Sequence, residues 1–296
     1  MKKIVKIGSR DSALAIAQTN LIVNHLRQCH PELDWELITM KTTGDRILDR
    51  SLEKIGGKGL FVKELDRALR CGEIDLAVHS LKDIPMDLPE DLPIVACFQR
   101  GDPRDALVLP LSPRQTPPHV VGSSSSRRRI QLQRLWEGVS VASVRGNIQT
   151  RLRKLDAGDY DALILAAAGL QRAGLSHRIS RYFSTDEILP AAGQGILAVQ
   201  GRKNDVPVDL SCIHHPASAA AATAEREFVR MLQGGCTSPI AAYAQVSGGE
   251  IHLTGLYYRE EQNDFFRSSC TGPLEQARQL GGLLAESMKK EAEERP

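Results

Sequence analysis

Serines and arginines follow one another in the segment SSSSRRR, residues 123–129. The segment opens a helix, and helix N-termini bind anions through their free N–H groups and the macrodipole. Arginines at that end oppose the dipole, so we expect a bound anion to offset their charge. Arg145 and Arg151 follow the next strand, at the equivalent end of the sheet. Because a guanidinium binds carboxylate or phosphate with two hydrogen bonds, these loops favour an anion site over a solvated turn.

A second polar cluster, HSLKD at residues 79–83, follows the short apolar strand expected at 75–79. Open α/β sheets bind ligands at the carboxyl ends of their strands. Asp83, with Lys82 beside it, is therefore a candidate for moving protons in a cleft, although an isolated aspartate is more often a turn or cap residue. No G-x-S-x-G segment supports a serine hydrolase.

Cys236 lies in the glycine-rich segment QGGCTSP, where a displayed thiol is a candidate nucleophile or attachment point. Its local sequence slightly favours the alternative, a small buried side chain, which is the usual environment of a free cysteine. The other cysteines form no C-x-x-C pair, so we expect reduced thiols. His25 and Cys29 share a helix face without a further ligand nearby, and no metal site is predicted.

Two glycine-rich segments superficially match nucleotide-binding motifs. KIGGKGLF, residues 54–61, places Lys54 and Lys58 among glycines but lacks the spacing of a Walker A motif. GQGILA, residues 193–198, leads into a strand rather than a helix. Neither segment therefore predicts a nucleotide site.

Alternating strands and helices are expected to position these residues, which is typical of βαβ units and largely parallel sheets. Strands are expected at residues 4–8, 35–39, 75–79, 120–123, 139–144, 162–166 and 196–200, and helices at 12–28, 60–70, 123–135 and 148–155. A small α+β part follows, with helices at 216–232 and 274–293 and strands at 240–245, 251–258 and 264–270.

The length of 296 residues suggests two or three domains. We expect domain 1 at residues 1–98 with a return segment at 195–214, domain 2 at 99–194 and a C-terminal domain at 215–296. Charged residues make up 25% of the chain and apolar residues 42%, which excludes a disordered or coiled-coil protein.

Charge and hydropathy argue against polyanionic and membrane partners. A net charge of +2 and 4% aromatic residues are unlike a nucleic-acid-binding groove. The longest apolar run, residues 162–170, is about half of the roughly 20 residues that a membrane helix needs. The first residues contain no secretory apolar core, so we expect a cytoplasmic protein.

Ten segments, taken in order and spacing, resemble the porphobilinogen deaminase family, also called hydroxymethylbilane synthases. They are IGSRDSALA, TTGDRILD, KIGGKGLFVKEL, IDLAVHSLKDIP, RGDPRDAL, GSSSSRRR, VRGNIQTRL, YDALILAAAGLQR, LPAAGQG and QGGCTSPIA.

The resemblance implies an α/β fold with two periplasmic-binding-protein-like (type II) domains around a cleft and a small α+β C-terminal domain. It implies a transferase of tetrapyrrole and heme biosynthesis that joins four porphobilinogen molecules, with loss of ammonia, to a dipyrromethane cofactor. Hydrolysis then releases hydroxymethylbilane. Cys236 is expected to hold the cofactor as a thioether, and the enzyme is expected to be a monomer with no nucleic-acid, membrane or metal partner.

The same resemblance assigns roles to single residues. Asp83 is expected to be catalytic. Expected cofactor-binding residues are Cys236, Lys82, Asp83, Ser125, Arg127, Arg128 and Arg145, and expected substrate-binding residues are Arg10, Ser12, Lys58, Phe61, Arg151 and Arg172. Ser126, Arg129 and Thr237 depart from the family pattern. The main alternative, an anion-binding protein without catalysis, would keep the arginines but would need neither Asp83 nor an exposed Cys236.

Overall fold

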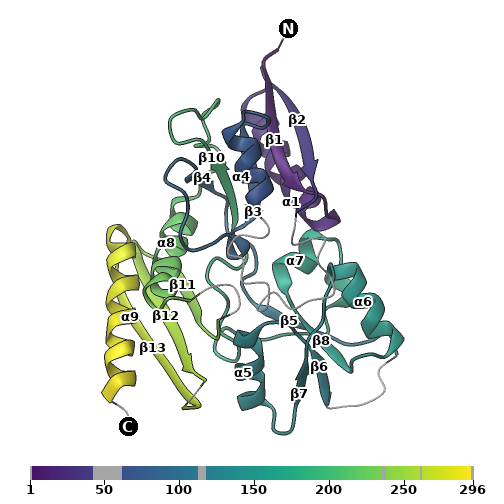
Figure 1. Ribbon diagram of the computed structural model, residues 1–296, viewed down its shortest axis with the longest axis vertical. Helices are drawn as coiled ribbons and strands as arrows, with labels where there is room; N and C mark the ends of the chain where they lie inside the picture. Colours follow the sequence, from purple (N-terminus) through teal and green to yellow (C-terminus); the bar gives the residue numbers. More distant parts are fainter. Residues whose placement is uncertain (1, 43–61, 113–117, 235–237, 261, 295–296) are drawn as a thin grey trace. The chain divides into compact units, whose positions relative to one another are not determined.

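The computed structural model describes residues 2–42, 62–112, 118–234, 238–260 and 262–294 (Figure 1). The chain divides into two compact units, each continuous in space but not in sequence. Unit 1 contains Met1–Arg100 and Ile196–Ala219, and unit 2 contains Gly101–Gly195 and Ala220–Pro296. Within the described ranges, no helix has both the length and the apolar character that crossing a bilayer requires.

Unit 1 is built on a five-stranded sheet with the order β2-β1-β3-β10-β4. Its β1 pairs in parallel with β2 and β3, whereas β10 is antiparallel to both β3 and β4. The strands are β1 (Ile4–Arg10), β2 (Asp34–Met40), β3 (Leu76–Ser80), β4 (Ile94–Cys97) and β10 (Leu197–Gly201), and the helices are α1 (Ala13–Cys29) and α4 (Lys63–Arg70).

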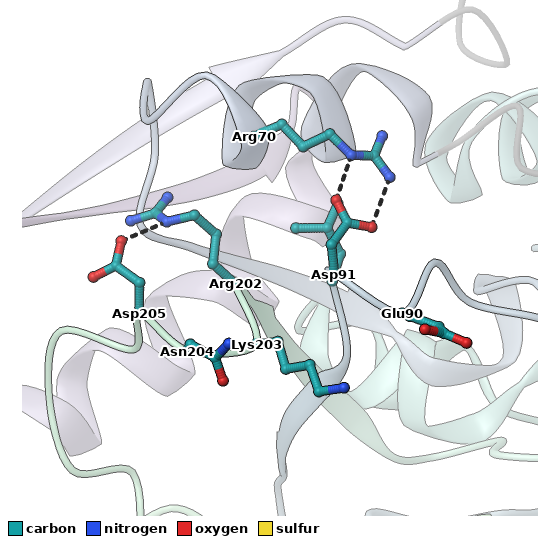
Figure 2. Close-up of a pocket in the computed structure, with 8 residues that line it drawn as sticks. Arg70, Glu90, Asp91, Arg202, Lys203, Asn204 and Asp205 are labelled. Carbon is teal, nitrogen blue, oxygen red and sulfur yellow. Dashed lines mark hydrogen bonds and ion pairs between the residues drawn. The ribbon is translucent and has the colours of Figure 1, made fainter.

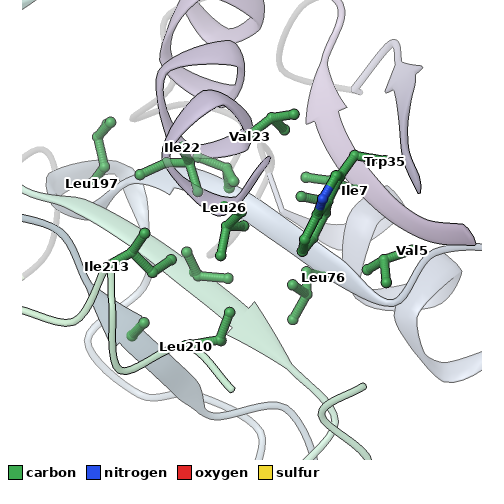
Figure 3. Close-up of a cluster of buried hydrophobic side chains, with 13 residues drawn as sticks. Val5, Ile7, Ile22, Val23, Leu26, Trp35, Leu76, Leu197, Leu210 and Ile213 are labelled. Carbon is green, nitrogen blue, oxygen red and sulfur yellow. The ribbon is translucent and has the colours of Figure 1, made fainter. Parts of the chain in front are cut away.

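Alternating side chains of β3 divide the core of unit 1 between the two faces of the sheet, because successive strand residues point to opposite sides. Leu76 and Val78 join the cluster that α1 closes with Ile22 and Leu26 (Figure 3). Ala77 joins the cluster on the face covered by α4. The two helices therefore hold the sheet from opposite faces and fix the end of β3.

The first sheet of unit 2 has the order β7-β6-β8-β5-β9. Its β6 is parallel to β7 and β8, and β5 is antiparallel to β8 and β9. The strands are β5 (Asp105–Val108), β6 (Val120–Gly122), β7 (Ser140–Ala142), β8 (Ala162–Ala166) and β9 (Arg181–Tyr182), and the helices are α5 (Ser126–Leu135), α6 (Ile148–Ala157) and α7 (Ala167–Arg172).

The second sheet of unit 2 is an antiparallel meander of β11 (Ala241–Ser247), β12 (Glu250–Arg259) and β13 (Asp264–Pro273). Two helices, α8 (Pro216–Met231) and α9 (Ala277–Glu294), pack beside it (Figure 1). They approach closely at Gly281, where an added Cβ would lie 2.3 Å from the carbonyl oxygen of Ala224. Only glycine fits that contact, so a larger residue there would force the two helices apart.

The expected strands and helices lie within a few residues of the observed ones, but the sheets are mixed rather than largely parallel. Among the described residues, the sequence analysis missed the short elements β4, β5, β9 and α7 and the 3-10 turns Leu81–Asp83 and Ser176–Arg178. Each has six residues or fewer, too few to show a periodicity. Antiparallel pairing arises where β10 returns beside β3 and where β5 lies beside β8.

Candidate active site

In unit 1, the described candidate residues lie at the carboxyl ends of the parallel strands β1 and β3, that is, at one end of the sheet. Because β1 and β3 are parallel, with Gly8 paired to Ala77, their carboxyl ends lie at the same edge. Arg10 ends β1, and Ser12 caps α1 by accepting a hydrogen bond from the N–H of Ala15 at 3.2 Å. Candidate residues that are far apart in the sequence thus become neighbours of the β3 terminus.

A single 3-10 turn, Leu81–Asp83, carries Lys82 and Asp83 directly after β3. The turn is fixed by its buried Leu81, whose N–H donates to the carbonyl oxygen of Ile196 at 3.0 Å. Just before it, Ser80 Oγ donates to Gln18 Oε1 of α1 at 3.0 Å. Lys82 and Asp83 are half-buried on this anchored turn, so their backbone is held before any ligand arrives.

His79, from the same polar cluster, lies in the interior of unit 1. Burial lowers its pKa to about 4, so the imidazole is neutral at physiological pH. Its Nε2 lies 3.1 Å from Gln200 Oε1, and Gln200 Nε2 donates to the carbonyl oxygen of Leu92 at 2.9 Å. His79 therefore joins β3 to β10 instead of titrating beside Asp83, and sequence analysis had not identified its partner Gln200.

In unit 2, three parallel strands again bring candidate loops to one edge. The carboxyl ends of β6, β7 and β8 lie together, and the antiparallel β5 begins there because Asp105 pairs with Ala166. This edge carries the N-terminus of α5, the loop containing Arg145, and α7.

A buried ion-pair triad lies beneath the N-terminus of α5. Arg127 Nη2 donates to Asp105 Oδ2 at 2.8 Å, and Arg128 Nη2 donates to Asp105 Oδ1 at 2.7 Å. The side chains are 4%, 9% and 0% exposed for Arg127, Arg128 and Asp105. The sequence analysis assigned the compensating negative charge to a bound anion, but a carboxylate of the chain itself neutralises part of it.

Burial alone would raise the pKa of Asp105, but the charges of Arg127 and Arg128 outweigh it and hold that pKa well below its usual range. Gln194 Nε2 adds a hydrogen bond of 2.9 Å to Asp105 Oδ1. Sequence analysis missed Asp105, although a signal existed. An aspartate that opens the apolar run DALV is buried with its strand, and a buried carboxylate requires cationic partners.

Serine hydroxyls fix the start of α5 against the neighbouring loop. Ser125 Oγ accepts from the N–H of Arg128 at 3.5 Å, as a helix cap does. Ser124 Oγ donates to the carbonyl oxygen of Val144 at 2.7 Å and accepts from its N–H at 3.1 Å. The half-buried Arg145 follows Val144 directly, so this pairing ties its loop to the start of α5.

Arg151 and Arg129, the remaining arginines near the starts of α6 and α5, have different surroundings. Arg151 Nε donates to the carbonyl oxygen of Gly146 at 2.8 Å, which holds its side chain against the loop before α6. Arg129, the third arginine of the run, is exposed and pairs with Glu260 at 3.1 Å. Arg129 thus lies outside the buried triad that Arg127 and Arg128 form with Asp105.

Arg172, at the end of α7, is a mostly buried cation. Its Nη2 donates to the carbonyl oxygen of Gly195 at 2.6 Å, and among the described residues no carboxylate forms an ion pair with it. Burial lowers its pKa to about 10, so the guanidinium stays charged at neutral pH. Within the same described ranges, the buried Arg128 Nε also has no hydrogen-bond partner. The Arg172 guanidinium is therefore suited to binding a carboxylate that the protein does not supply.

Three predicted site residues, Lys58, Phe61 and Cys236, lie outside the described residues, as does Thr237. Ser126, another departure from the family pattern, is the first residue of α5 and is half-buried. A search of the described ranges finds no group of three or more histidine, cysteine or acidic residues that could hold a metal ion.

A hollow of about 500 Å³ in unit 1 lies at the other end of the strands, away from the carboxyl ends of β1 and β3 (Figure 2). It is lined by residues around the start of β4 and the end of β10, and Gly201 at that end pairs with Leu76 at the start of β3. Four of its charged side chains form ion pairs, Arg70 with Asp91 and Arg202 with Asp205, each at 2.7 Å. The hollow is therefore separate from the edge that carries Asp83.

Comparison with known proteins identifies two family models. "Porphobilinogen deaminase, dipyromethane cofactor binding domain" matches residues 5–209, and "Porphobilinogen deaminase, C-terminal domain" matches residues 219–290. A porphobilinogen deaminase of Ruminiclostridium josui is 52% identical over 98% of both chains. One of Acetivibrio thermocellus is 49% identical over 98% of this chain and 99% of its own.

Among solved structures, the periplasmic aliphatic sulphonate binding protein SsuA from Escherichia coli is 15% identical to the chain. The match covers 79% of this chain and 71% of SsuA, with a TM-score of 0.41.

Proposed function

The chain belongs to the porphobilinogen deaminase family, and from that premise we propose that Asp83 is its catalytic acid–base residue and that its arginines bind the carboxylates of cofactor and substrate. The family activity is the head-to-tail condensation of four porphobilinogen molecules onto a dipyrromethane cofactor, with release of ammonia, followed by hydrolysis to hydroxymethylbilane.

One observation carries the binding part of this proposal, namely the buried Arg172 guanidinium with no carboxylate partner among the described residues. Burying an unpaired charge destabilises a fold, so such a group indicates a ligand that brings the opposite charge. Each pyrrole carries an acetate and a propionate, and carboxylates bind arginine through charge-assisted hydrogen bonds. Arg172 therefore fits a carboxylate-rich group, whereas the Nε of Arg128, which also has no partner among the described residues, is fully buried.

The proposed assignments follow the two sheet edges. Lys82 and Asp83 on unit 1, and Ser125, Arg127, Arg128 and Arg145 on unit 2, are proposed to bind the cofactor, which Cys236 holds as a thioether. Arg10, Ser12, Lys58, Phe61, Arg151 and Arg172 are proposed to bind substrate or the growing chain. Because Arg127 and Arg128 both pair with Asp105, we assign Asp105 the role of orienting them.

When bound, the dipyrromethane supplies the pyrrole carbon to which the first substrate unit is joined. Asp83 is half-buried on an anchored turn, so the backbone that carries its carboxylate is held in place. As ammonia leaves porphobilinogen, positive charge develops on the substrate's pyrrole, and the Asp83 carboxylate stabilises that charge by accepting a hydrogen bond from the ring N–H. The same carboxylate then moves the proton that must be lost when two pyrroles join.

The experiment that tests this function compares the intact mass of the purified protein with that of Cys236→Ser. We expect the native protein to exceed its sequence mass by two linked pyrrole units and the variant to match its bare chain. A native mass equal to the bare chain, unchanged after incubation with porphobilinogen, would contradict the proposal. The non-catalytic anion-binding alternative would then be favoured.

Replacing Arg172 with glutamine is expected to raise the KM for porphobilinogen by about 10- to 100-fold, because one charge-assisted hydrogen bond is lost. The melting temperature should stay unchanged or rise, since the variant removes a mostly buried charge that has no carboxylate partner among the described residues. Arg178→Gln is the matched control, because Arg178 pairs with Asp156 at 2.7 Å and has no assigned role in binding. Steady-state kinetics that give both variants the wild-type KM would contradict the assignment of Arg172.

We also propose a monomeric enzyme that works in the cytoplasm and binds no nucleic acid. The large apolar side chains that are exposed among the described residues lie on separate segments; they are Ile4, Leu111, Leu135 and Leu283. Scattered exposed side chains of this kind are normal for a monomer. Sedimentation velocity on the full-length protein tests the monomer, and a dimer at micromolar concentration would contradict it.

A further inference from the structure

Two cysteines from distant parts of the sequence lie against each other on the surface of unit 1. Cys29 is the last residue of α1. Cys212 lies in a turn, beyond the loop that follows β10. Both residues are exposed free cysteines, and the Cys29 thiol is close enough to Cys212 to raise its pKa. The proposed function uses neither of them.

The contacts on either side of the pair hold the two segments together. Leu26, one helical turn before Cys29, packs in the same buried cluster as Leu210 and Ile213, which flank Cys212 (Figure 3). On the other side, His30 Nε2 donates to the carbonyl oxygen of Asp209 at 2.8 Å. The proximity of the thiols is therefore built into the core of unit 1, because the surrounding residues fix both backbones.

We propose that Cys29 and Cys212 form a reversible disulfide that ties the C-terminal end of α1 to the segment after β10, with a peroxide as the oxidant. One thiol attacks the peroxide, its sulfur becomes a sulfenic acid, and one water is released from hydrogen peroxide. The second thiol then attacks that sulfur, the S–S bond forms, and the second water leaves. In total the two sulfurs give up two electrons, and hydrogen peroxide is reduced to two water molecules.

The surroundings of the pair disfavour the thiolate form of Cys212 at neutral pH. Partial burial and the neighbouring Cys29 thiol raise the pKa of Cys212 to about 11, so its thiolate is scarce at neutral pH. The exposure of both residues lets a small oxidant reach them. The proposal does not depend on the proposed catalytic function.

The test treats the cofactor-loaded protein with hydrogen peroxide in mildly alkaline buffer, blocks free thiols by alkylation and maps the peptides by mass spectrometry. We expect one cross-linked peptide pair joining Cys29 to Cys212, with the loss of two hydrogens, and its disappearance after dithiothreitol. The bond would close a loop of about 180 residues and restrict the unfolded chain, so the melting temperature should rise by about 5 °C or more.

Three variants make the result specific. Cys29→Ser and Cys212→Ser should each abolish the cross-linked peptide and the peroxide-induced rise in melting temperature, while their reduced forms melt close to the wild type. Cys71→Ser removes an exposed cysteine at the end of α4 and should retain both effects. Trapping of separate sulfenic acids at both positions in the wild type without a cross-link, or a link from either cysteine to another partner, would overturn the proposal.

Discussion

Replacing Asp83 with asparagine is expected to lower the rate of porphobilinogen condensation at least about 100-fold, because a side-chain amide neither holds a negative charge nor moves a proton. Asparagine keeps the shape of the side chain, and the turn itself is held by Leu81 and Ile84 backbone contacts. The fold should therefore survive. Single-turnover measurement of ammonia release on cofactor-loaded protein checks the rate, and circular dichroism checks the fold.

Asp87→Asn provides the control for Asp83→Asn. Asp87 is an exposed aspartate four residues further along the same loop, so its substitution changes the net charge equally. We expect Asp87→Asn to retain the wild-type rate. If both variants were equally slow, a general loss of negative charge would explain the effect. If Asp83→Asn kept the wild-type rate while carrying the cofactor, Asp83 would have no role as acid or base.

The residues at strand ends could be located from the sequence because strand periodicity reveals where a strand stops. Lys82 and Arg145 were expected after apolar strands, and the structure places each directly beyond β3 or close beyond β7. Parallel pairing then explains why such loops share an edge. The sequence thus indicates which residues lie near a strand terminus, but it does not reveal how each side chain is partnered once the sheet has formed.

Partners distant in sequence account for what the sequence analysis missed. Asp105 lies 22 and 23 residues from Arg127 and Arg128, and His79 lies 121 residues from Gln200. Local spacing carries no information on such pairs, because tertiary packing creates them. The cluster HSLKD illustrates the consequence, since His79 is buried and neutral whereas Asp83 is half-buried beyond the strand.

Replacing Asp105 with asparagine is expected to lower the free energy of unfolding by about 3–5 kcal/mol, because it leaves two buried guanidiniums without their carboxylate. Asp102→Asn is the control, since Asp102 pairs with Arg104, whose side chain is 43% exposed. Such a pair contributes about 1 kcal/mol or less. Urea unfolding of the three proteins measures the difference, and equal losses for the two variants would contradict a special role for Asp105.

The pH dependence of this loss of unfolding free energy distinguishes an effect of the Asp105 charge from an effect of the side chain's shape. The pKa of Asp105 is held below its usual value in the fold, so its contribution is fully present above the unfolded pKa of about 4. This stabilising contribution is lost as the pH falls through the lower pKa that Asp105 has in the folded protein. The difference in unfolding free energy between wild type and Asp105→Asn should thus be constant from pH 7 to about 4 and should narrow in stronger acid.

A second substitution tests whether the unpaired cations cause the instability. Adding Arg128→Met to Asp105→Asn removes one uncompensated buried charge and keeps an apolar side chain of similar length. The double variant should therefore recover part of the lost free energy, although Arg128→Met alone destabilises the triad. Strictly additive losses would mean that the carboxylate stabilises the fold through packing. Recovery would show that the Asp105 carboxylate offsets the charges of two arginines buried within the protein.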